Sequence, residues 1–364
     1  MNRFIKAVTL FVSIVVISGT FFYLGYRAAL YDFPLLSPLS LAPTPTPKPL
    51  LAFTIPALAE REFITSELKI QALLKSDERF KTYTFSFVTL AKKMTGTINI
   101  PVNIPDTENA KAIVMLRGYV APESYQPGLG TRNAAAVLAE NGFITVAPDF
   151  FSYGGSEPEP TDSWQARFEK PIIVAELIKT LEAQPLEVTA VNDGESSEKT
   201  TLYFIKALGL WGHSNGGQIA LTTLEVLNRP IPTTLWAPVT APFPYSILFF
   251  SDEVVDEGKA MRQWLSIFER DYDVFEFTLT KHLHRLRGPL QLHHGTADEA
   301  ALIVWSDEFA DKIEVENKRR LELEPMAETI ELTYFRYPGA DHNLQPSWQT
   351  VVERDLQFFN QNLQ

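Results

Sequence analysis

Two periodicities describe most of this chain: an alternation with a period of two near residue 85, and short apolar runs separated by helical segments beyond residue 110. Lys81 to Leu90 alternates aromatic with polar residues, which predicts a half-buried strand, and Thr97 to Ile100 is its expected hairpin partner. The spacing of apolar residues around Glu60 to Leu74 predicts an amphipathic helix. Later runs that are apolar on both faces predict buried strands, at 112–116, 143–147, 207–211, 233–239, 290–293 and 330–335.

Helical segments separate these apolar runs. Because strands buried on both faces alternate with helices, the pattern predicts a mostly parallel sheet with helices on both sides. The acidic, serine-rich segment 192–199 is expected to be an exposed loop before a buried strand. The predicted helices are 131–141, 172–183, 215–228, 302–320 and a last helix that places Trp348, Val351, Val352, Leu356 and Phe359 on one face.

The N-terminus begins with an uncharged run from Ala7 to Tyr26. At 1.5 Å per residue its twenty residues span a hydrocarbon core of about 30 Å, so residues 1–26 are predicted to be a membrane anchor with one transmembrane helix. Arg3 and Lys6 precede the run, which favours a cytoplasmic N-terminus with the rest of the chain extracytoplasmic. The alternative is a cleaved signal peptide.

A proline-rich segment follows this run. Six prolines between residues 34 and 49, ending in PTPTPKP, favour extended backbone and exclude a helix. Residues 27–50 are therefore predicted to be a semi-rigid stalk that joins the cell-membrane anchor to a catalytic domain at 51–364.

Composition limits the possible functions of that domain. The 364 residues include 45% hydrophobic residues, as expected of a folded protein with a sizeable core. The formal net charge of -12 argues against a nucleic-acid partner. The absence of cysteine excludes disulfides, thiolate metal sites and a cysteine nucleophile.

The motif with the clearest chemistry is LWGHSNGGQIAL at 210–221. Gly212, Ser214 and Gly216 form G-x-S-x-G between a predicted buried strand and a predicted helix, the context of a strained turn that exposes a nucleophilic serine. The Asn215 N–H, at the start of that helix, is placed to donate to a developing oxyanion.

A serine nucleophile of this kind needs an acid and a base, which follow it in the chain. Asp298 follows the predicted strand 290–293, and after it the chain has a single histidine, His342, which follows the strand 330–335. We therefore expect His342 to act as the base and Asp298 to orient it, with Glu299 and Asp341 as rival acids.

The second oxyanion donor is expected in an early loop. Strand 112–116 leads into Arg117, Gly118 and Tyr119, and the Tyr119 N–H is the expected donor, although the Tyr119 side chain is open to a phenol role or to simple packing. No metal is expected: the pairs His293-His294 and His282-x-His284 match no zinc motif, and adjacent residues of a strand point to opposite faces. No cofactor is expected either, since no glycine-rich phosphate loop follows a strand.

These motifs resemble the α/β-hydrolase superfamily, and within it the prolyl-oligopeptidase-like peptidases and the dienelactone-hydrolase-like esterases. The resemblance implies an eight-stranded, mostly parallel sheet, a triad of Ser214, Asp298 and His342, and oxyanion donors at Tyr119 and Asn215. The segments that carry it are MLRGY at 115–119, APDFFSYGGSE at 147–157, LWGHSNGG at 210–217, LHHGTADE at 292–299 and YPGADHNL at 337–344.

Residues 241–287 are longer than a helical crossover requires, so they are predicted to be a cap or lid. Aromatic residues of this segment are expected either to line an apolar substrate pocket or to pack the cap on the body. Its acids either receive a substrate amine or are simply solvated. The aromatic residues are Phe249, Phe250, Trp264, Phe268, Phe275 and Phe277, and the acids are Asp252, Glu253, Asp256 and Glu257.

The sequence thus predicts a membrane-tethered serine hydrolase that forms an acyl-enzyme on Ser214 and acts on a peptide or small-molecule substrate. A prolyl-oligopeptidase-like peptidase is the first expectation and a carboxylesterase is the alternative. A non-catalytic surface binding module on a hydrolase fold is disfavoured because every position that the chemistry needs is filled. Residues alone leave the oligomeric state open.

Overall fold

The computed structural model describes residues 16–23, 26–27, 47–191, 198–251 and 255–364, in two compact units that divide between Lys48 and Pro49. Within the first unit, the described residues 16–23 are helical. No helix in the described ranges has the length and hydropathy needed to cross a membrane. Residues 1–15 and 24–25 of the predicted anchor, and most of the predicted stalk, lie outside those ranges.

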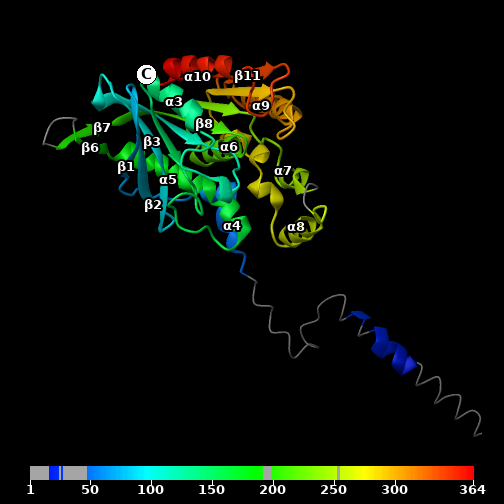
Figure 1. Ribbon diagram of the computed structural model, residues 1–364. Helices are drawn as coiled ribbons and strands as arrows, with labels where there is room; N and C mark the ends of the chain where they lie inside the picture. The colour runs from blue at the N-terminus through cyan, green and yellow to red at the C-terminus, as the bar shows by residue number, and fades with distance from the viewer. Residues whose placement is uncertain (1–15, 24–25, 28–46, 192–197, 252–254) are drawn as a thin grey trace, which may run out of the picture. The chain divides into compact units, whose positions relative to one another are not determined.

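The second unit is built on a mixed sheet of nine strands, in the order β1-β2-β3-β5-β4-β8-β9-β10-β11 (Figure 1). The first three strands are antiparallel to their neighbours, and the six strands from β5 to β11 run parallel to one another. The strands are β1 (Lys69–Ser76), β2 (Phe80–Thr89), β3 (Lys92–Pro101), β4 (Ala110–Leu116), β5 (Ile144–Pro148), β8 (Ile205–His213), β9 (Thr233–Trp236), β10 (Leu290–Gly295) and β11 (Leu332–Tyr337).

The predicted hairpin and the predicted parallel strands are present, but the expectation of eight strands was wrong by one. The additional strand, β1, lies where an amphipathic helix was predicted around Glu60 to Leu74. Its backbone pairs with β2 at the sheet edge, with Ile70 opposite Phe85, so only one side of the segment meets the protein and Leu73 and Leu74 remain exposed. Pairing with an available edge has outweighed a helical spacing of apolar residues.

A second, two-stranded sheet was also not predicted. Strands β6 (Leu186–Val191) and β7 (Glu198–Tyr203) form an antiparallel hairpin, in which Leu186 lies opposite Tyr203. Residues 198 and 199, which were expected in a loop, belong to β7, while residues 192–197 lie outside the described ranges.

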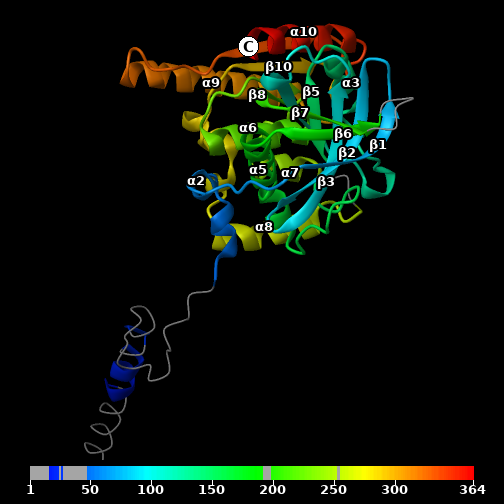
Figure 2. The ribbon, with the colours of Figure 1, turned by 90° about the vertical axis from the view of Figure 1, so that its left-hand side faces the viewer.

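Helices cover both faces of the large sheet (Figures 1 and 2). Helices α3 and α10 share one apolar cluster with the sheet, and α5, α6 and α9 share another on the opposite face. The helices are α2 (Ile55–Ala59), α3 (Arg132–Glu140), α4 (Ser163–Phe168), α5 (Lys170–Ala183), α6 (Asn215–Leu227), α7 (Tyr245–Phe249), α8 (Lys259–Asp271), α9 (Ile303–Leu323) and α10 (Trp348–Asn362). Short 3₁₀ helices include η1 (Pro49–Phe53), η5 (Val274–Phe277), η6 (Leu279–Lys281) and η7 (Leu283–Arg285).

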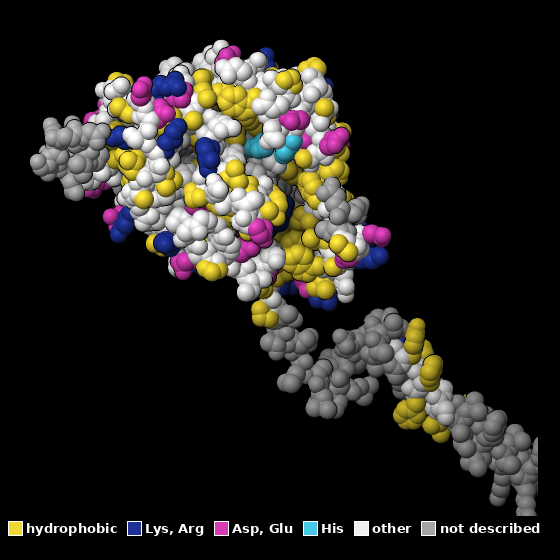
Figure 3. All heavy atoms as spheres, in the orientation of Figure 1, with side chains coloured by type: hydrophobic (Ala, Val, Ile, Leu, Met, Phe, Trp, Pro, Cys, Tyr) yellow, Lys and Arg dark blue, Asp and Glu magenta, His cyan; other side chains and the backbone are white. Residues whose placement is uncertain are grey.

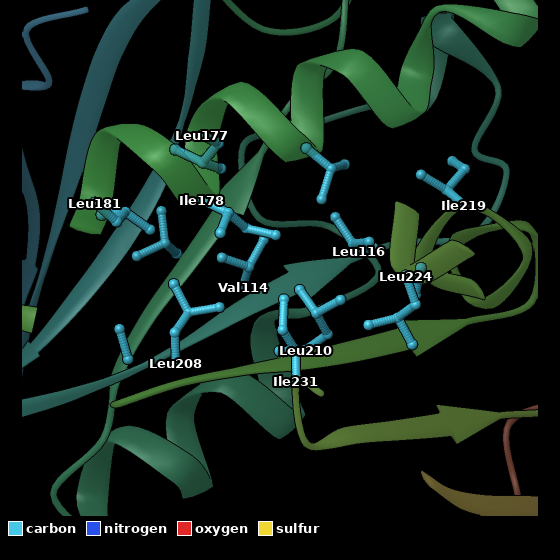
Figure 4. Close-up of a cluster of buried hydrophobic side chains, with 14 of the residues drawn as sticks. Val114, Leu116, Leu177, Ile178, Leu181, Leu208, Leu210, Ile219, Leu224 and Ile231 are labelled. Carbon is cyan, nitrogen blue, oxygen red and sulfur yellow. The ribbon is translucent and has the colours of Figure 1, made fainter. Parts of the chain in front are cut away.

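Strands buried on both faces explain why these runs lack polar alternation. Figure 4 shows the larger cluster: Leu177 and Ile178 of α5 lie over Val114 of β4 and Leu210 of β8, and Leu224 of α6 closes one side. Each of these side chains is fully buried. Burying one such aliphatic side chain contributes about 1.5–3 kcal/mol, so this contact between sheet and helices stabilises the fold strongly.

The segment 241–287, predicted to be a cap, packs through its aromatic rings. Trp264 of α8 stacks on Trp164 of α4, with ring centroids 4.3 Å apart, and Phe268 and Phe277 are buried beside it. Trp264, Phe268 and Phe277 therefore join this segment to the body, which was one of the two expectations for its aromatic residues. Phe249 remains partly exposed and contacts Trp305.

The apolar residues just after Lys48 belong to the folded unit, which makes a stability prediction. Leu58 of α2 is 1% exposed and packs with Ile55 and Ile172, whereas Leu51 is 48% exposed. We expect Leu58→Ala to lower the free energy of unfolding by about 2–5 kcal/mol, because it opens a cavity. Leu51→Ala is the control, and we expect it to stay within about 0.5 kcal/mol of the parent in urea unfolding. Equal effects would contradict this packing.

Candidate active site

Ser214 occupies a strained turn between β8 and α6. Its φ of 57° and ψ of -123° are unfavourable for a residue with a side chain. A Cβ on Gly216 would lie 2.0 Å from the Leu116 carbonyl oxygen, so only glycine permits this crossing of α6 and β4. The Ser214 N–H donates to the Trp236 carbonyl at 2.9 Å, and the Val239 N–H donates to the Ser214 carbonyl at 3.1 Å. These two hydrogen bonds, to the end of β9 and to the residues just after it, keep Ser214 in its strained conformation.

Asp298 and His342 meet at the same edge of the sheet. Asp298 lies in the loop after β10 and His342 in the loop after β11, and these two strands are parallel neighbours. The His342 Nδ1 and the Asp298 Oδ2 are 2.8 Å apart. The Asp298 side chain is inaccessible to solvent, while 22% of the His342 side chain is exposed. The carboxylate is thus covered and the imidazole can reach a ligand.

Further donors surround the Asp298 carboxylate. Its Oδ1 accepts the N–H groups of Ala300 and Ala301, each at 2.9 Å, and its Oδ2 lies 3.1 Å from the His294 Nε2. Burial raises the pKa of Asp298, but hydrogen bonds from His294, His342 and Ala301 outweigh it, so the pKa falls well below its usual value. Asp298 is therefore ionised at neutral pH and accepts the Nδ1–H of His342.

The two rival acids occupy other positions. Glu299 is exposed. Asp341 is also exposed, and its Oδ1 accepts the N–H groups of Asn343 and Gln345, which fixes the turn that carries His342. Within the described part of the chain, the carboxylate hydrogen-bonded to His342 belongs to Asp298.

His213 is a neighbour of His342 that sequence reasoning did not assign. Its ring centroid lies 4.7 Å from that of His342, and its Nε2–H donates to the His342 carbonyl at 2.9 Å. Burial, together with the nearby His342, lowers the pKa of His213 to about 4, so it remains neutral. This hydrogen bond holds the loop that carries His342 against His213, the residue immediately before Ser214.

Among the described residues, no hydrogen bond joins the Ser214 hydroxyl to His342. Catalytic hydrogen bonds commonly form or shorten only when a substrate is bound. Both side chains are half-buried. On the face drawn in Figure 3, histidine side chains reach the surface beside a hollow bordered by hydrophobic residues.

The early loop expected to supply an oxyanion donor passes directly over Ser214. A Cβ on Gly118 would lie 2.9 Å from the Ser214 Cβ and 3.4 Å from its Oγ. Arg117 anchors this loop, because its guanidinium donates to the carbonyls of Gly118 and Asp149 and lies 4.0 Å from the Tyr153 ring centroid. The Tyr119 side chain is 77% exposed. The position suits the Tyr119 N–H, and the donor roles of Tyr119 and Asn215 remain predictions.

The adjacent histidines of β10 point to opposite faces of the sheet. His293 hydrogen-bonds Tyr337 and Asp355 on one side, and His294 hydrogen-bonds Ser306 and the Ala301 carbonyl on the other. No group of three or more His, Asp or Glu side chains is arranged to hold a metal ion in the described ranges. His294 instead supports Asp298, which its place in an apolar strand did not reveal.

The acids of the cap that the structure describes do not converge on the site. Asp256 accepts the N–H groups of Gly258 and Ala260, and the exposed Glu257 pairs with Lys259 at 3.4 Å. Asp252 and Glu253 lie outside the described residues. Asp256 thus has a local capping role, which neither of the two expectations for these acids described.

Comparisons with known proteins agree with this architecture. No protein-family model and no curated protein sequence matches the chain. Acetyl xylan esterase 1 from Thermoanaerobacterium sp. matches with a TM-score of 0.57 and 12% identity, over 86% of this chain and 94% of that one. An acetyl xylan esterase from Paenibacillus sp. matches with a TM-score of 0.56 and 12% identity, over 83% and 91%.

A puromycin-hydrolyzing peptidase from Mycobacterium tuberculosis matches with a TM-score of 0.50 and 16% identity, over 82% of this chain but 39% of that one. Sheet order, strand direction and these matches show that the chain has the α/β-hydrolase fold. At such low identity the likeness establishes the fold, and the chemistry is argued from the site.

The lowered pKa of Asp298 makes a prediction about acid stability. A carboxyl group whose pKa is lower in the folded than in the unfolded protein stabilises the fold above the unfolded pKa, and loses this effect as pH falls through the folded pKa. We expect Asp298→Asn to reduce the free energy of unfolding at pH 7, and the difference from the parent to shrink below about pH 4.

Urea unfolding between pH 7 and pH 3 measures this difference. Glu299→Gln removes a neighbouring but exposed carboxylate, and we expect it to change stability by less than about 0.5 kcal/mol at every pH. A deficit for Asp298→Asn that is independent of pH would show that the hydrogen bonds to Asp298 do not favour its ionised form.

Proposed function

We propose that this protein is a carboxylic ester hydrolase in which Ser214 is the nucleophile, His342 the general base and Asp298 the acid that orients His342. The observation that carries this proposal is the buried, ionised Asp298 hydrogen-bonded to His342 at the sheet edge where Ser214 occupies its strained turn. No part of this assignment needs a metal or a cofactor.

Acylation follows from the proposed roles. The Asp298 carboxylate accepts the Nδ1–H of His342, which leaves Nε2 without a proton and able to accept one. As the Ser214 Oγ attacks the ester carbonyl carbon, its proton passes to Nε2, and the positive imidazolium is stabilised by Asp298. The same proton then goes to the leaving alkoxide, which departs as an alcohol and leaves an acyl-enzyme.

The negative oxygen of the tetrahedral intermediate needs donors in fixed positions. The Asn215 N–H, at the first turn of α6, and the Tyr119 N–H, in the loop held by Arg117, are the proposed pair. Water then attacks the acyl-enzyme with His342 again as base, and the released acid restores Ser214.

An esterase is proposed ahead of a peptidase because two of the three structural neighbours described above are esterases. The peptidase neighbour keeps a serine peptidase as the second candidate, although most of that protein lies outside the match. Short acyl esters and aminoacyl amides, offered to the same preparation, separate the two. A higher kcat/KM for the amides would reverse the order.

Covalent labelling tests the nucleophile directly. We expect a fluorophosphonate to label the full-length protein at Ser214, because only a serine activated by a base reacts with it at a useful rate. Ser214→Ala should abolish labelling, and Ser246→Ala, which alters a buried serine of the cap, is the matched control that should leave it intact. Absence of labelling in the parent would favour a non-catalytic binding module.

The membrane anchor at residues 7–26 remains a proposal, supported by the uncharged run and the basic residues before it. We expect the full chain to sediment with membranes and to resist extraction by carbonate, while a fragment that begins at Pro49 should remain in the supernatant with equal activity. Sequencing of the mature N-terminus provides the decisive result. A start beyond Tyr26 would indicate a cleaved signal peptide and a secreted enzyme.

A further inference from the structure

A small cavity lies against the first turns of α6, the helix that begins directly after Ser214. Asn215, which follows Ser214 directly, lines it together with Gln218 one turn further along. Its volume is about 40 Å³. One water needs roughly 10–15 Å³ of such volume, so the cavity has room for a small group but not for an aromatic ring.

Two basic side chains line this cavity from the opposite side. Arg167 ends α4 and Lys170 begins α5, so the junction between these helices brings both cations to one place. The Arg167 Nη2 donates to the Gln218 Oε1 at 3.0 Å, which holds the guanidinium against α6. The Gln218 amide nitrogen is left to donate to a ligand.

Neither cation forms an ion pair with a carboxylate in the part of the chain that the structure describes. Burial lowers the pKa of Arg167 to about 10 and that of Lys170 to about 8, and both values leave the side chains mainly protonated at pH 7. A partly buried cation without an anion is costly, because little solvent remains to stabilise its charge. An anionic ligand would remove this cost.

Other charged groups near Lys170 do not neutralise the pair. Arg117 adds a positive charge, and Glu159 is exposed. Glu169 is buried, and burial raises its pKa to about 7, so its carboxyl group carries only part of a negative charge at neutral pH. The cavity wall therefore has a net positive charge.

We propose that Arg167 and Lys170 form a cationic subsite beside Ser214 that binds a carboxylate of the ester substrate. This inference rests on the proposed esterase function, and it specifies the substrate class as esters with one free carboxylate. The aromatic side chains of Phe168, Phe243 and Phe277 complete the walls and suit an aliphatic linker.

The small volume of the cavity favours a short linker. With a rise of 1.5 Å per residue, Gln218 lies about 4.5 Å along the helix axis from Asn215, so the part of the cavity wall that α6 supplies between them is short. Short half-esters, in which three or four bonds separate the reacting carbonyl carbon from the carboxylate carbon, are therefore suitable probes. The carboxylate can belong to the acyl group or to the leaving alcohol, and both sources present the same anion.

A pair of matched esters tests the subsite on each side. Monoethyl succinate and ethyl pentanoate differ by a carboxylate in the acyl group, and 3-acetoxypropanoate and butyl acetate differ by one in the alcohol. Hydrolysis in a pH-stat gives kcat/KM for each. We expect the full-length protein to prefer the anionic member of at least one pair, and that pair identifies the source of the carboxylate.

Arg167→Gln should then lower the anionic-to-neutral ratio of kcat/KM at least tenfold, since a hydrogen bond to a charged group is worth a factor of about ten or more. Arg167→Lys should restore part of this ratio because it retains the charge. Lys318→Gln is the control, since it removes one exposed cation from α9, and it should leave the ratio unchanged. A ratio unaffected by Arg167→Gln, or equally affected by Lys318→Gln, would overturn the subsite.

Failure of the subsite and failure of the proposed function give different results. If Ser214 is labelled and neutral esters are hydrolysed but neither anionic ester is preferred, the subsite is wrong and the esterase stands. If no ester is hydrolysed, calorimetry with succinate on Ser214→Ala, and on Ser214→Ala with Arg167→Gln, decides the question. If succinate binds to Ser214→Ala but not to the variant that also carries Arg167→Gln, a carboxylate site exists without the esterase. If succinate binds to neither variant, the site is rejected.

Discussion

The turn at Ser214 is the constraint on which the other parts of the site depend. A residue with a side chain at a φ of 57° costs of order 1–3 kcal/mol, and the turn persists because the Trp236 carbonyl at the end of β9 and the Val239 N–H just after it hold it on both sides. The same turn brings Gly216 against the Leu116 carbonyl, so α6 cannot move without displacing β4. The position of the serine is thus fixed by the central strands of the sheet.

Strand order then determines which loops can reach that serine. Because β8, β9, β10 and β11 are successive parallel neighbours, their carboxyl ends lie along one edge, and residues from loops far apart in the sequence meet there. Asp298 and His342 are joined in this way across 44 positions. The buried donors around Asp298 keep it ionised, and His213 holds the carbonyl of His342. Each interaction reduces the freedom of the imidazole.

The sequence predicted the parts of this structure in which local pattern and burial agree. Strands buried on both faces have no polar alternation, and the strand-to-helix context of Ser214 is local. The edge strand β1 was missed because its stability comes from pairing with β2, and its leucines remain exposed. His213 and Arg167 were missed because their partners come from distant segments. His294 was missed because its place in an apolar strand does not reveal its contact with Asp298, four residues later.

This protein would have to select an anionic substrate through short-range contacts. The chain carries a formal charge of -12, so its overall field repels an anion at long range, although salt screens that field beyond about 8 Å in physiological solution. Within the cavity the balance would reverse, because Arg167 and Lys170 line it and are partly shielded from solvent. The proposed preference for a carboxylate would therefore arise after encounter, in the bound complex, where Phe168, Phe243 and Phe277 line the cavity beside the charges and lower the local dielectric constant.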